Sequence, residues 1–254
     1  MARGLPVPQP NKSAAGAPQS RGNRLLAALP ATDYARLRPV LEPVVLRLRQ
    51  VLSEPGDAIT HVYFPTMAVV PLLLLVEDGT SVEIALVGND GLIGQPLALG
   101  LDRATHRALN QIPGIALRLS AGAFRSALNQ SGALRQVLQR YTQALLVQAA
   151  QGAACNRLHS IYGRCARRLL ETHDRVDQDE FPLTQDLFAS FLAVRRATVS
   201  VAAGRLQQAG LIRYHRGSIT VLDRAGLQAA ACECYRTIKT FTDRLLGPDR
   251  RFGR

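Results

Sequence analysis

The fold is decided by residues 183–222, which read LTQDLFASFLAVRRATVSVAAGRLQQAGLIRYHRGSITVL. From Leu187 onward this stretch contains no Asp or Glu. Its arginines are Arg195, Arg196, Arg205, Arg213 and Arg216. Because a long segment of a single charge sign repels itself, the pattern favours an anionic partner.

The same stretch has the pattern of two short helices and a hairpin. Thr184 is a good N-cap for the first helix, and a break at residues 193–195 precedes a second helix over 196–209. Gly210 ends that helix. Two strand-like segments, 211–214 and 218–221, then flank a turn. This order of helix, tight turn, helix and two-stranded wing predicts a winged helix-turn-helix.

Several segments resemble the Crp/Fnr family of bacterial transcription regulators: THDRV, LTQ, the run from VRRATVS to GRLQQAGLIRY, and GSITVLDR. The resemblance is specific in the helix-turn-helix and extends over nearly the whole chain after its N-terminal tail. It departs from the family at Ala193, where the turn usually has Gly. If that residue has a positive φ, Ala costs about 1 kcal/mol.

The resemblance also assigns roles at the DNA. Arg196 matches the family position that contacts guanine, since its planar guanidinium can bond O6 and N7 together. The next family contacts, an acid and a second basic residue, are Ala197 and Val201 here, and both can only touch a thymine methyl. Ser200 can reach a base or a phosphate. Contacts to the DNA backbone are expected from the remaining polar residues, Gln185, Arg195, Thr198, Arg205 and, on the wing, Arg216.

Composition suits a nucleic-acid-binding protein and excludes some other classes. The chain has 254 residues, is 47% hydrophobic and carries a net charge of +12, so it can hold two domains and attract polyanions. No set of nucleophile, base and orienting group marks an enzyme. The best membrane candidate, Met67–Val76, is too short, and no signal peptide is evident. We therefore expect a cytoplasmic protein that does not contact a membrane.

Short strands and turns dominate residues 44–119, after one or two short helices between Arg24 and Leu41. The strands are expected at 44–48, 59–64, 69–76, 82–87 and 115–119, which predicts a β-barrel or sandwich. The resemblance implies a double-stranded β-roll of the cyclic-nucleotide-binding type. The chain is thus expected to be an α+β protein with five parts: a disordered tail (1–22), a β-roll sensor-like domain (23–131), a dimerisation helix and connecting helix (132–173), a winged helix-turn-helix domain with an extra C-terminal helix (174–246), and a basic tail (247–254).

Relatives that bind a cyclic nucleotide hold its ribose with a Gly-Glu pair and its phosphate with Arg followed by Ser or Thr. Here the first pair is Gly94-Gln95, and Ala104-Thr105 falls at the second, with Arg103 one residue early. A shift of one residue turns a strand side chain to the opposite face. We therefore expect a degenerate cassette, little response to cyclic AMP, and an effector that this sequence does not identify.

A long helix is predicted from Leu134 to Arg157. Along it runs a 4-3 spacing, here called the heptad seam, formed by Leu134, Leu138, Tyr141, Leu145, Gln148, Gly152 and Cys155. We expect the helix to serve two purposes: the seam pairs with the same helix of a second subunit, and the other edge packs on the β-roll. Gly152 has two interpretations, a close helix–helix approach or a break, since Gly costs about 1 kcal/mol relative to Ala in a helix. A last helix is expected from Asp223 to Leu246.

The four cysteines do not predict a metal or redox site. Cys232 and Cys234 stand two apart on the expected last helix and should point to opposite sides. Cys155 and Cys165 lie on different helices, and the iron–sulfur members of the family use N-terminal cysteines. We expect buried thiols, no metal and no cofactor; a link between two copies of Cys155 across the dimer is the alternative.

These observations predict a sequence-specific transcription regulator that binds a palindromic operator in double-stranded DNA as a homodimer. Its half-sites should lie about 10–10.5 base pairs apart. RNA polymerase is a further candidate partner. The alternative is a ligand- or redox-responsive module whose helix-turn-helix contacts protein. Salt-dependent binding to duplex DNA separates the two hypotheses, because phosphate neutralisation releases counterions.

Overall fold

The computed structural model describes residues 22–247, so the predicted tails lie outside it except for Gly22 and Gly247. Three short helices come first: α1 (Arg24–Ala27), α2 (Ala31–Leu37) and the 3-10 helix η1 (Arg38–Val40). A second 3-10 helix, η2 (Gln95–Leu99), lies among the strands. The strands are β1 (Glu42–Leu46), β2 (Val51–Ser53), β3 (His61–Pro65), β4 (Val70–Leu75), β5 (Ser81–Val87), β6 (Arg107–Leu109) and β7 (Gly114–Ser120).

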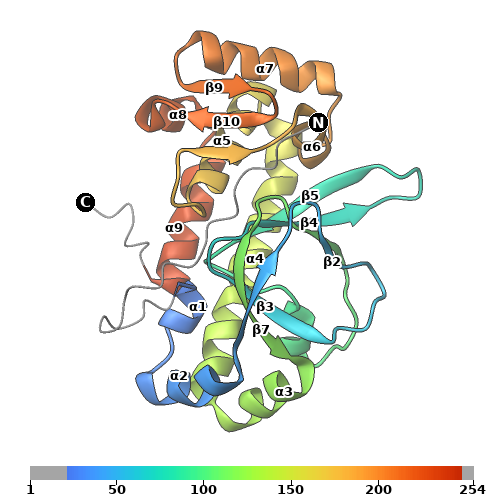
Figure 1. Cartoon of the computed structure of the whole chain (residues 1–254). Coiled ribbons are helices and arrows are strands. Elements are labelled where there is room, and N and C mark those ends of the chain that lie inside the picture. The colour runs from blue at the N-terminus through green and yellow to red at the C-terminus, as the bar shows by residue number, and fades with distance from the viewer. Residues whose placement is uncertain (1–21, 248–254) are drawn as a thin grey trace.

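Two antiparallel sheets form the N-terminal half (Figure 1). One has the order β1-β7-β3 and the other β2-β6-β4-β5. Gly79, with φ 82°, closes the predicted β4–β5 hairpin. The predicted strands are all present within a few residues, and the sheets form the β-roll that the resemblance implied. Strands β2 and β6 were not predicted, because three residues are too few to show a two-residue period.

The β-roll leads through α3 (Ala121–Gln130) into the longest helix, α4 (Gly132–Leu158). The Ser131 hydroxyl caps α4 by accepting a hydrogen bond from Leu134 N at 3.0 Å. The Tyr141 hydroxyl donates to the Leu92 carbonyl at 3.0 Å, and burial raises the pKa of Tyr141. Because the helix is continuous through Gly152, the interpretation of that residue as a break is wrong.

The heptad seam faces the inside of its own chain, so the predicted interface is wrong for its buried residues, Leu134, Leu138, Tyr141, Gln148 and Cys155. Leu134, Leu138 and Tyr141 are 2%, 2% and 3% exposed, and they pack in the core of the β-roll. Gln148 and Cys155 are also buried, while Leu145 and Gly152 are half-buried. Side chains covered by their own domain cannot contact a second subunit. A helix stripe that packs on a domain core has nearly the same period as a coiled-coil seam, and this explains the error.

The C-terminal half holds the winged helix-turn-helix. Its elements are α5 (Ile161–His173), β8 (Glu180–Pro182), α6 (Gln185–Phe191), α7 (Arg196–Gln208), β9 (Ile212–His215), β10 (Ser218–Val221), α8 (Arg224–Ala230) and α9 (Cys234–Leu246). The wing is a three-stranded sheet of order β8-β10-β9, rather than the predicted two-stranded hairpin. Strand β8 was missed because it sits in a polar segment. Among residues 22–247, no single helix is long and apolar enough to cross a membrane, although α6 and α7 reach that composition as a pair bent by 105°.

The predicted last helix is two helices. Asp223 caps α8 as expected, its carboxylate accepting from Gly226 N at 2.9 Å. The chain then leaves the helix at residues 231–233 and starts again as α9, which packs along α4 (Figure 1). This break was not visible in the sequence, because no Gly or Pro marks it.

Buried ion pairs join α5 and the turn after it to the β-roll. The Arg168 guanidinium on α5 lies 2.7 Å from the Glu83 carboxylate on β5, with 1% and 8% of the two side chains exposed. It also donates to the Gln111 side chain at 2.7 Å. Arg175 lies 2.7 Å from Asp90. Because a buried charge without a partner is costly, these pairs tie the two halves together.

Candidate functional site

The turn between α6 and α7 has the geometry that a helix-turn-helix requires. Ala193 has φ 50°, and its N–H donates to the Ser190 carbonyl at 3.1 Å. The next residue, Val194, donates to the Ala189 carbonyl at 3.1 Å. Together these bonds form a Schellman motif with Ala193 at the left-handed position, which usually holds Gly. The positive φ on which the predicted cost depended is therefore present.

The helix α7 turns a polar face to solvent. Its apolar side, Val199, Ala202, Ala203 and Leu206, is buried in the core of the domain. On the other side Arg195, Thr198 and Ser200 are exposed, and Val201 is 66% exposed although it is apolar. An exposed surface with cations, hydroxyls and one aliphatic group can bond phosphates and meet base edges.

Gln185 connects to two other predicted contact residues across the two helices. Its side-chain oxygen accepts from Arg196 Nε at 3.3 Å, and its amide nitrogen donates to Ser200 Oγ at 3.5 Å. Arg196 also lies 3.6 Å from Asp186, and both side chains are more than half exposed. The structure thus places Gln185, Arg196 and Ser200 side by side at the N-terminal end of α7.

Two further predicted arginines, Arg205 and Arg216, lie apart from this group. Arg205 is near the end of α7, and its guanidinium stacks on the Tyr162 ring at 5.0 Å. Arg216 is exposed at the tip of the wing, in a two-residue turn with φ 47° at Arg216 and 81° at Gly217. Positive φ at both positions defines a type I′ turn, which favours Asn, Asp or Gly.

A cavity of about 300 Å³ opens between the β-roll and α4. It contains the predicted cassette only in part: Gly94, Gln95, Ala104 and Thr105 line it, but Arg103 does not. The Arg103 guanidinium instead donates to the Gly56 carbonyl at 2.8 Å. Gln95 donates to the Thr142 hydroxyl on α4 at 2.9 Å. The described lining includes neither Arg nor Lys, and burial lowers the pKa of its His106.

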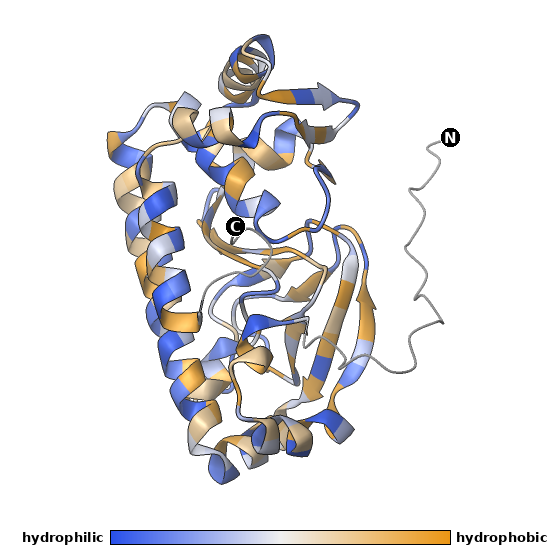
Figure 2. Ribbon diagram, turned by 90° about the vertical axis from the view of Figure 1, so that its left-hand side faces the viewer, coloured by the Kyte–Doolittle hydropathy of each residue, from blue (hydrophilic) through white to orange (hydrophobic). Residues whose placement is uncertain are grey.

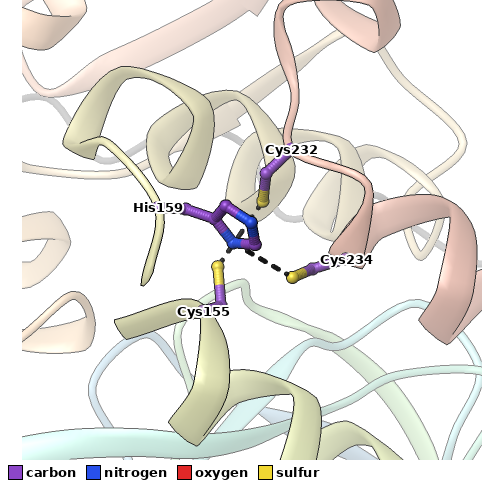
Figure 3. Close-up of side chains that lie close together, drawn as sticks. All are labelled: Cys155, His159, Cys232 and Cys234. Carbon is purple, nitrogen blue, oxygen red and sulfur yellow. Dashed lines mark hydrogen bonds between the residues drawn. The ribbon is translucent and has the colours of Figure 1, made fainter. Parts of the chain in front are cut away.

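Three of the four cysteines lie together, contrary to the sequence prediction. Cys155 on α4 lies beside Cys232 and Cys234, and His159 completes the group (Figure 3). Because the chain leaves the helix between α8 and α9, Cys232 and Cys234 point to one side rather than to opposite sides. Cys155 Sγ lies 3.5 Å from Cys232 Sγ and is buried in its own chain, whereas the alternative drawn from the sequence linked two copies of Cys155 across a dimer.

This group, here called the Cys3His cluster, consists of Cys155, His159, Cys232 and Cys234. A hydrogen bond from Cys232 lowers the pKa of Cys155 to about 5, against the effect of burial, and the positive charge of Arg167 adds to the lowering. Burial raises the pKa of Cys165, the cysteine outside the cluster, to about 12. Cys155 and His159 stand four residues apart at the end of one helix, which is a weak signal, but the sequence did not show that Cys232 and Cys234 meet them.

In this arrangement a winged helix-turn-helix with an exposed basic face is joined by a long helix to a β-roll that holds a cavity. Residues 163–230 match the family model described as the Crp-like helix-turn-helix domain. A comparison with curated protein sequences gave no match.

Solved structures share the fold over most of the chain. FixK2 from Bradyrhizobium japonicum has a TM-score of 0.64 at 18% identity, over 76% of this chain and 98% of that chain. A transcriptional regulator of the CRP family from Thermus thermophilus has 0.60 at 20% identity, over 74% and 96%. CLP from Xanthomonas campestris, a c-di-GMP responsive global regulator, has 0.57 at 13% identity, over 76% and 99%. The chain therefore contains a Crp-like helix-turn-helix domain, and over most of its length it shares the fold of these solved regulators.

Proposed function

We propose that this protein binds a palindromic DNA operator as a homodimer and regulates transcription without control by cyclic AMP. The observation that carries the proposal is the exposed face of α7, where Arg195, Arg196 and Ser200 project from one end of a helix without acidic residues. Such a face suits the major groove, since cations bond phosphates while Arg196 reads a guanine.

The wing supports the same proposal. Arg216 occupies a left-handed position at φ 47°, where a non-Gly residue costs roughly 1–2 kcal/mol. Asn or Gly would relieve that cost. A contact between Arg216 and a DNA phosphate would explain why an arginine occupies this strained position, because backbone strain persists where function requires the side chain.

We place the dimer interface on the outward face of α4, opposite the heptad seam. Leu146 is 61% exposed there, and Ala150 and Ala153 are exposed one and two turns further on. The hydropathy of the whole ribbon is shown in Figure 2. With Arg157 these residues repeat the 4-3 spacing of a coiled coil, and the alanines permit a close approach of two helices. Leu146 also lines the cavity, so a ligand held there would lie beside the second subunit.

The cavity favours an effector with little negative charge. A cyclic phosphate needs a paired cation, and the described lining includes neither Arg nor Lys. Its leucines, isoleucines and alanines suit an apolar ligand, with Gln95, Thr105 and Thr142 as hydrogen-bonding groups. Calorimetry should therefore detect no micromolar affinity for cyclic AMP; such an affinity would restore Arg103 as a phosphate ligand.

The DNA-binding test compares two adjacent arginines. On an operator selected from random duplexes, Arg196→Ala should cost about 1–3 kcal/mol, concentrated at one guanine per half-site. Arg195→Ala should weaken binding to all sequences alike and flatten the dependence on salt. If both variants lose the same affinity on specific and random DNA, the reading residue is wrongly assigned. If the wild type shows no salt-dependent DNA binding, the helix-turn-helix serves protein contacts instead.

The dimer test uses two exposed leucines of one helix. Leu146→Glu should give monomers in sedimentation velocity, since it puts a charge in the proposed interface. Leu158→Glu is the matched control: Leu158 is 73% exposed but lies off this face, so its variant should remain dimeric. A dimeric Leu146→Glu protein would place the interface elsewhere.

A further inference from the structure

We propose that the Cys3His cluster is a zinc site that clamps the end of α4 to the turn between α8 and α9 (Figure 3). The ligand atoms of the cluster all lie within 4.8 Å of one another. Two come from α4 and the residue that follows it, and two come from the turn that begins α9. The site therefore spans the two halves of the molecule.

The distances within the cluster suit one tetrahedral ion. Cys155 Sγ lies 3.5 Å from Cys232 Sγ, and Cys234 Sγ lies 3.3 Å from His159 Nδ1. In a tetrahedral zinc site, Zn–S bonds of about 2.3 Å and Zn–N bonds of about 2.0–2.1 Å place ligand atoms roughly 3.5–3.8 Å apart. These two pairs need to separate by only a few tenths of an ångström to accept the ion, and every other pair of ligand atoms lies within 4.8 Å.

The ligand types select the metal. Three thiolates and an imidazole suit zinc, whereas magnesium and calcium prefer oxygen ligands. Four protein ligands leave no open position, which is typical of a structural rather than a catalytic site. An iron–sulfur cluster distributes its cysteines over separate irons, and this requires a wider spacing of the ligand atoms than the structure has.

Neighbouring side chains orient the ligands, as metal sites require. His159 Nε2 lies 2.9 Å from the Glu233 carboxylate, so Nδ1 is the ring nitrogen that faces the thiols. This is the carboxylate–histidine arrangement that fixes the tautomer of a metal-bound imidazole. Gln151 Nε2 donates to Cys234 Sγ at 3.1 Å. Three thiolates and one Zn²⁺ sum to a charge of −1, and the buried Arg167 interacts electrostatically with Cys155 and Cys232.

The backbone of α5 also lets the turn between α8 and α9 approach closely. Gly163 on α5 carries no side chain where the turn approaches: an added Cβ would lie 3.3 Å from Cys232 N and 3.5 Å from Cys232 Cβ. Cys232 N donates to the Gly163 carbonyl at 3.4 Å. The turn is therefore held against α5 before any metal binds, which reduces the ordering that metal binding must impose.

Zinc at this position would fix the angle between the two halves. α4 ends at Leu158 and α5 begins at Ile161, so only His159 and Ser160 connect the long helix to the DNA-binding domain. As the ion binds, Cys232 and Cys234 each release a proton to solvent and join Cys155 as thiolates. The four bonds then join α4 directly to the segment after the wing, across that short connection.

The experiment measures zinc in the full-length protein, purified under anaerobic reducing conditions. Elemental analysis should give one zinc and no iron per chain. Replacement of the zinc by Co²⁺ should give thiolate-to-cobalt charge-transfer bands and the strong visible bands of a tetrahedral ion. Cys232→Ser should lose the stoichiometric metal, while Cys165→Ala, at the buried cysteine outside the cluster, should keep it. Glu233→Gln should weaken zinc affinity by roughly 10–100-fold, because it removes the carboxylate behind His159.

Several results would overturn the proposal. Wild-type protein without zinc, and without thiolate bands on Co²⁺ addition, contradicts it independently of whether the variants fold. Retention of zinc by Cys232→Ser marks an adventitious ion only. A metal-free protein that forms a Cys155–Cys232 disulfide on oxidation would make the cluster a dithiol redox pair instead. Unchanged affinity in Glu233→Gln would remove His159 from the site.

Discussion

Two opposite substitutions in the helix-turn-helix, Ala193→Gly and Gly204→Ala, should each stabilise the protein. Ala193 is exposed and has φ 50° in the turn before α7. A left-handed backbone costs an L-residue roughly 1–2 kcal/mol. Glycine removes that cost but loses about 0.5–1 kcal/mol more backbone entropy on folding. Ala193→Gly should therefore gain up to about 1.5 kcal/mol.

Gly204 shows the reverse case, in the interior of α7. An added Cβ there meets no atom within 4 Å, so Gly204→Ala should gain about 0.5–1 kcal/mol from helix propensity alone. For a protein of this size, 1 kcal/mol corresponds to about 2–4 °C in the thermal unfolding midpoint. Urea and thermal unfolding of the single and double variants would measure both gains, which should add because neither change touches the other residue.

The control for this prediction is Ala197→Gly, the same chemical change at a helical position of α7. It should lower stability by up to about 1 kcal/mol. If Ala193→Gly lowers the midpoint as Ala197→Gly does, the positive φ at Ala193 is not a source of strain, and the reasoning from the Schellman motif fails.

Three further outcomes are expected. Arg168→Met leaves Glu83 buried without its partner and should cost about 3–5 kcal/mol in urea unfolding, a loss that changing Glu83 to Leu as well should largely recover. Arg216→Asn should raise the thermal midpoint by relieving the wing turn and should also weaken DNA binding in a filter or anisotropy assay; unchanged affinity would remove Arg216 from the DNA interface. Gly152→Ala should stabilise the chain by about 1 kcal/mol in urea unfolding, because its added Cβ meets no atom within 4 Å. Gly114→Ala should destabilise the chain, because its added Cβ would lie 2.6 Å from the Met67 backbone; equal effects of the two variants would contradict this reasoning.

The helix-turn-helix was predictable because its signals are local. Thr184 caps α6 with its hydroxyl 3.3 Å from Leu187 N, as the sequence indicated. The apolar residues of α7 recur at the helical period, and Gly210 ends that region at φ 72°. Each of these features depends on residues within one or two turns of one another, so a short window of sequence contains them in full.

The predicted dimer seam failed for a different reason. A helix that packs on its own β-roll and a helix that packs on a second subunit need nearly the same spacing of apolar residues. The sequence therefore showed that α4 has an apolar stripe, but not what covers it. In the structure the roll covers Leu138 and Tyr141 and leaves Leu146 exposed, a choice that depends on contacts far away in the chain.

The sequence by itself thus determined the element types, the winged helix-turn-helix and the basic face of α7, because charge pattern, capping and periodicity are short-range properties. Tertiary structure alone decided the covered face of α4 and the Cys3His cluster. Cys155 and Cys232 are 77 residues apart in the chain, and they meet because an unmarked break after α8 turns Cys232 and Cys234 toward the end of α4. No local pattern carries that information, since it arises from the packing of α9 along α4 and of the turn against Gly163.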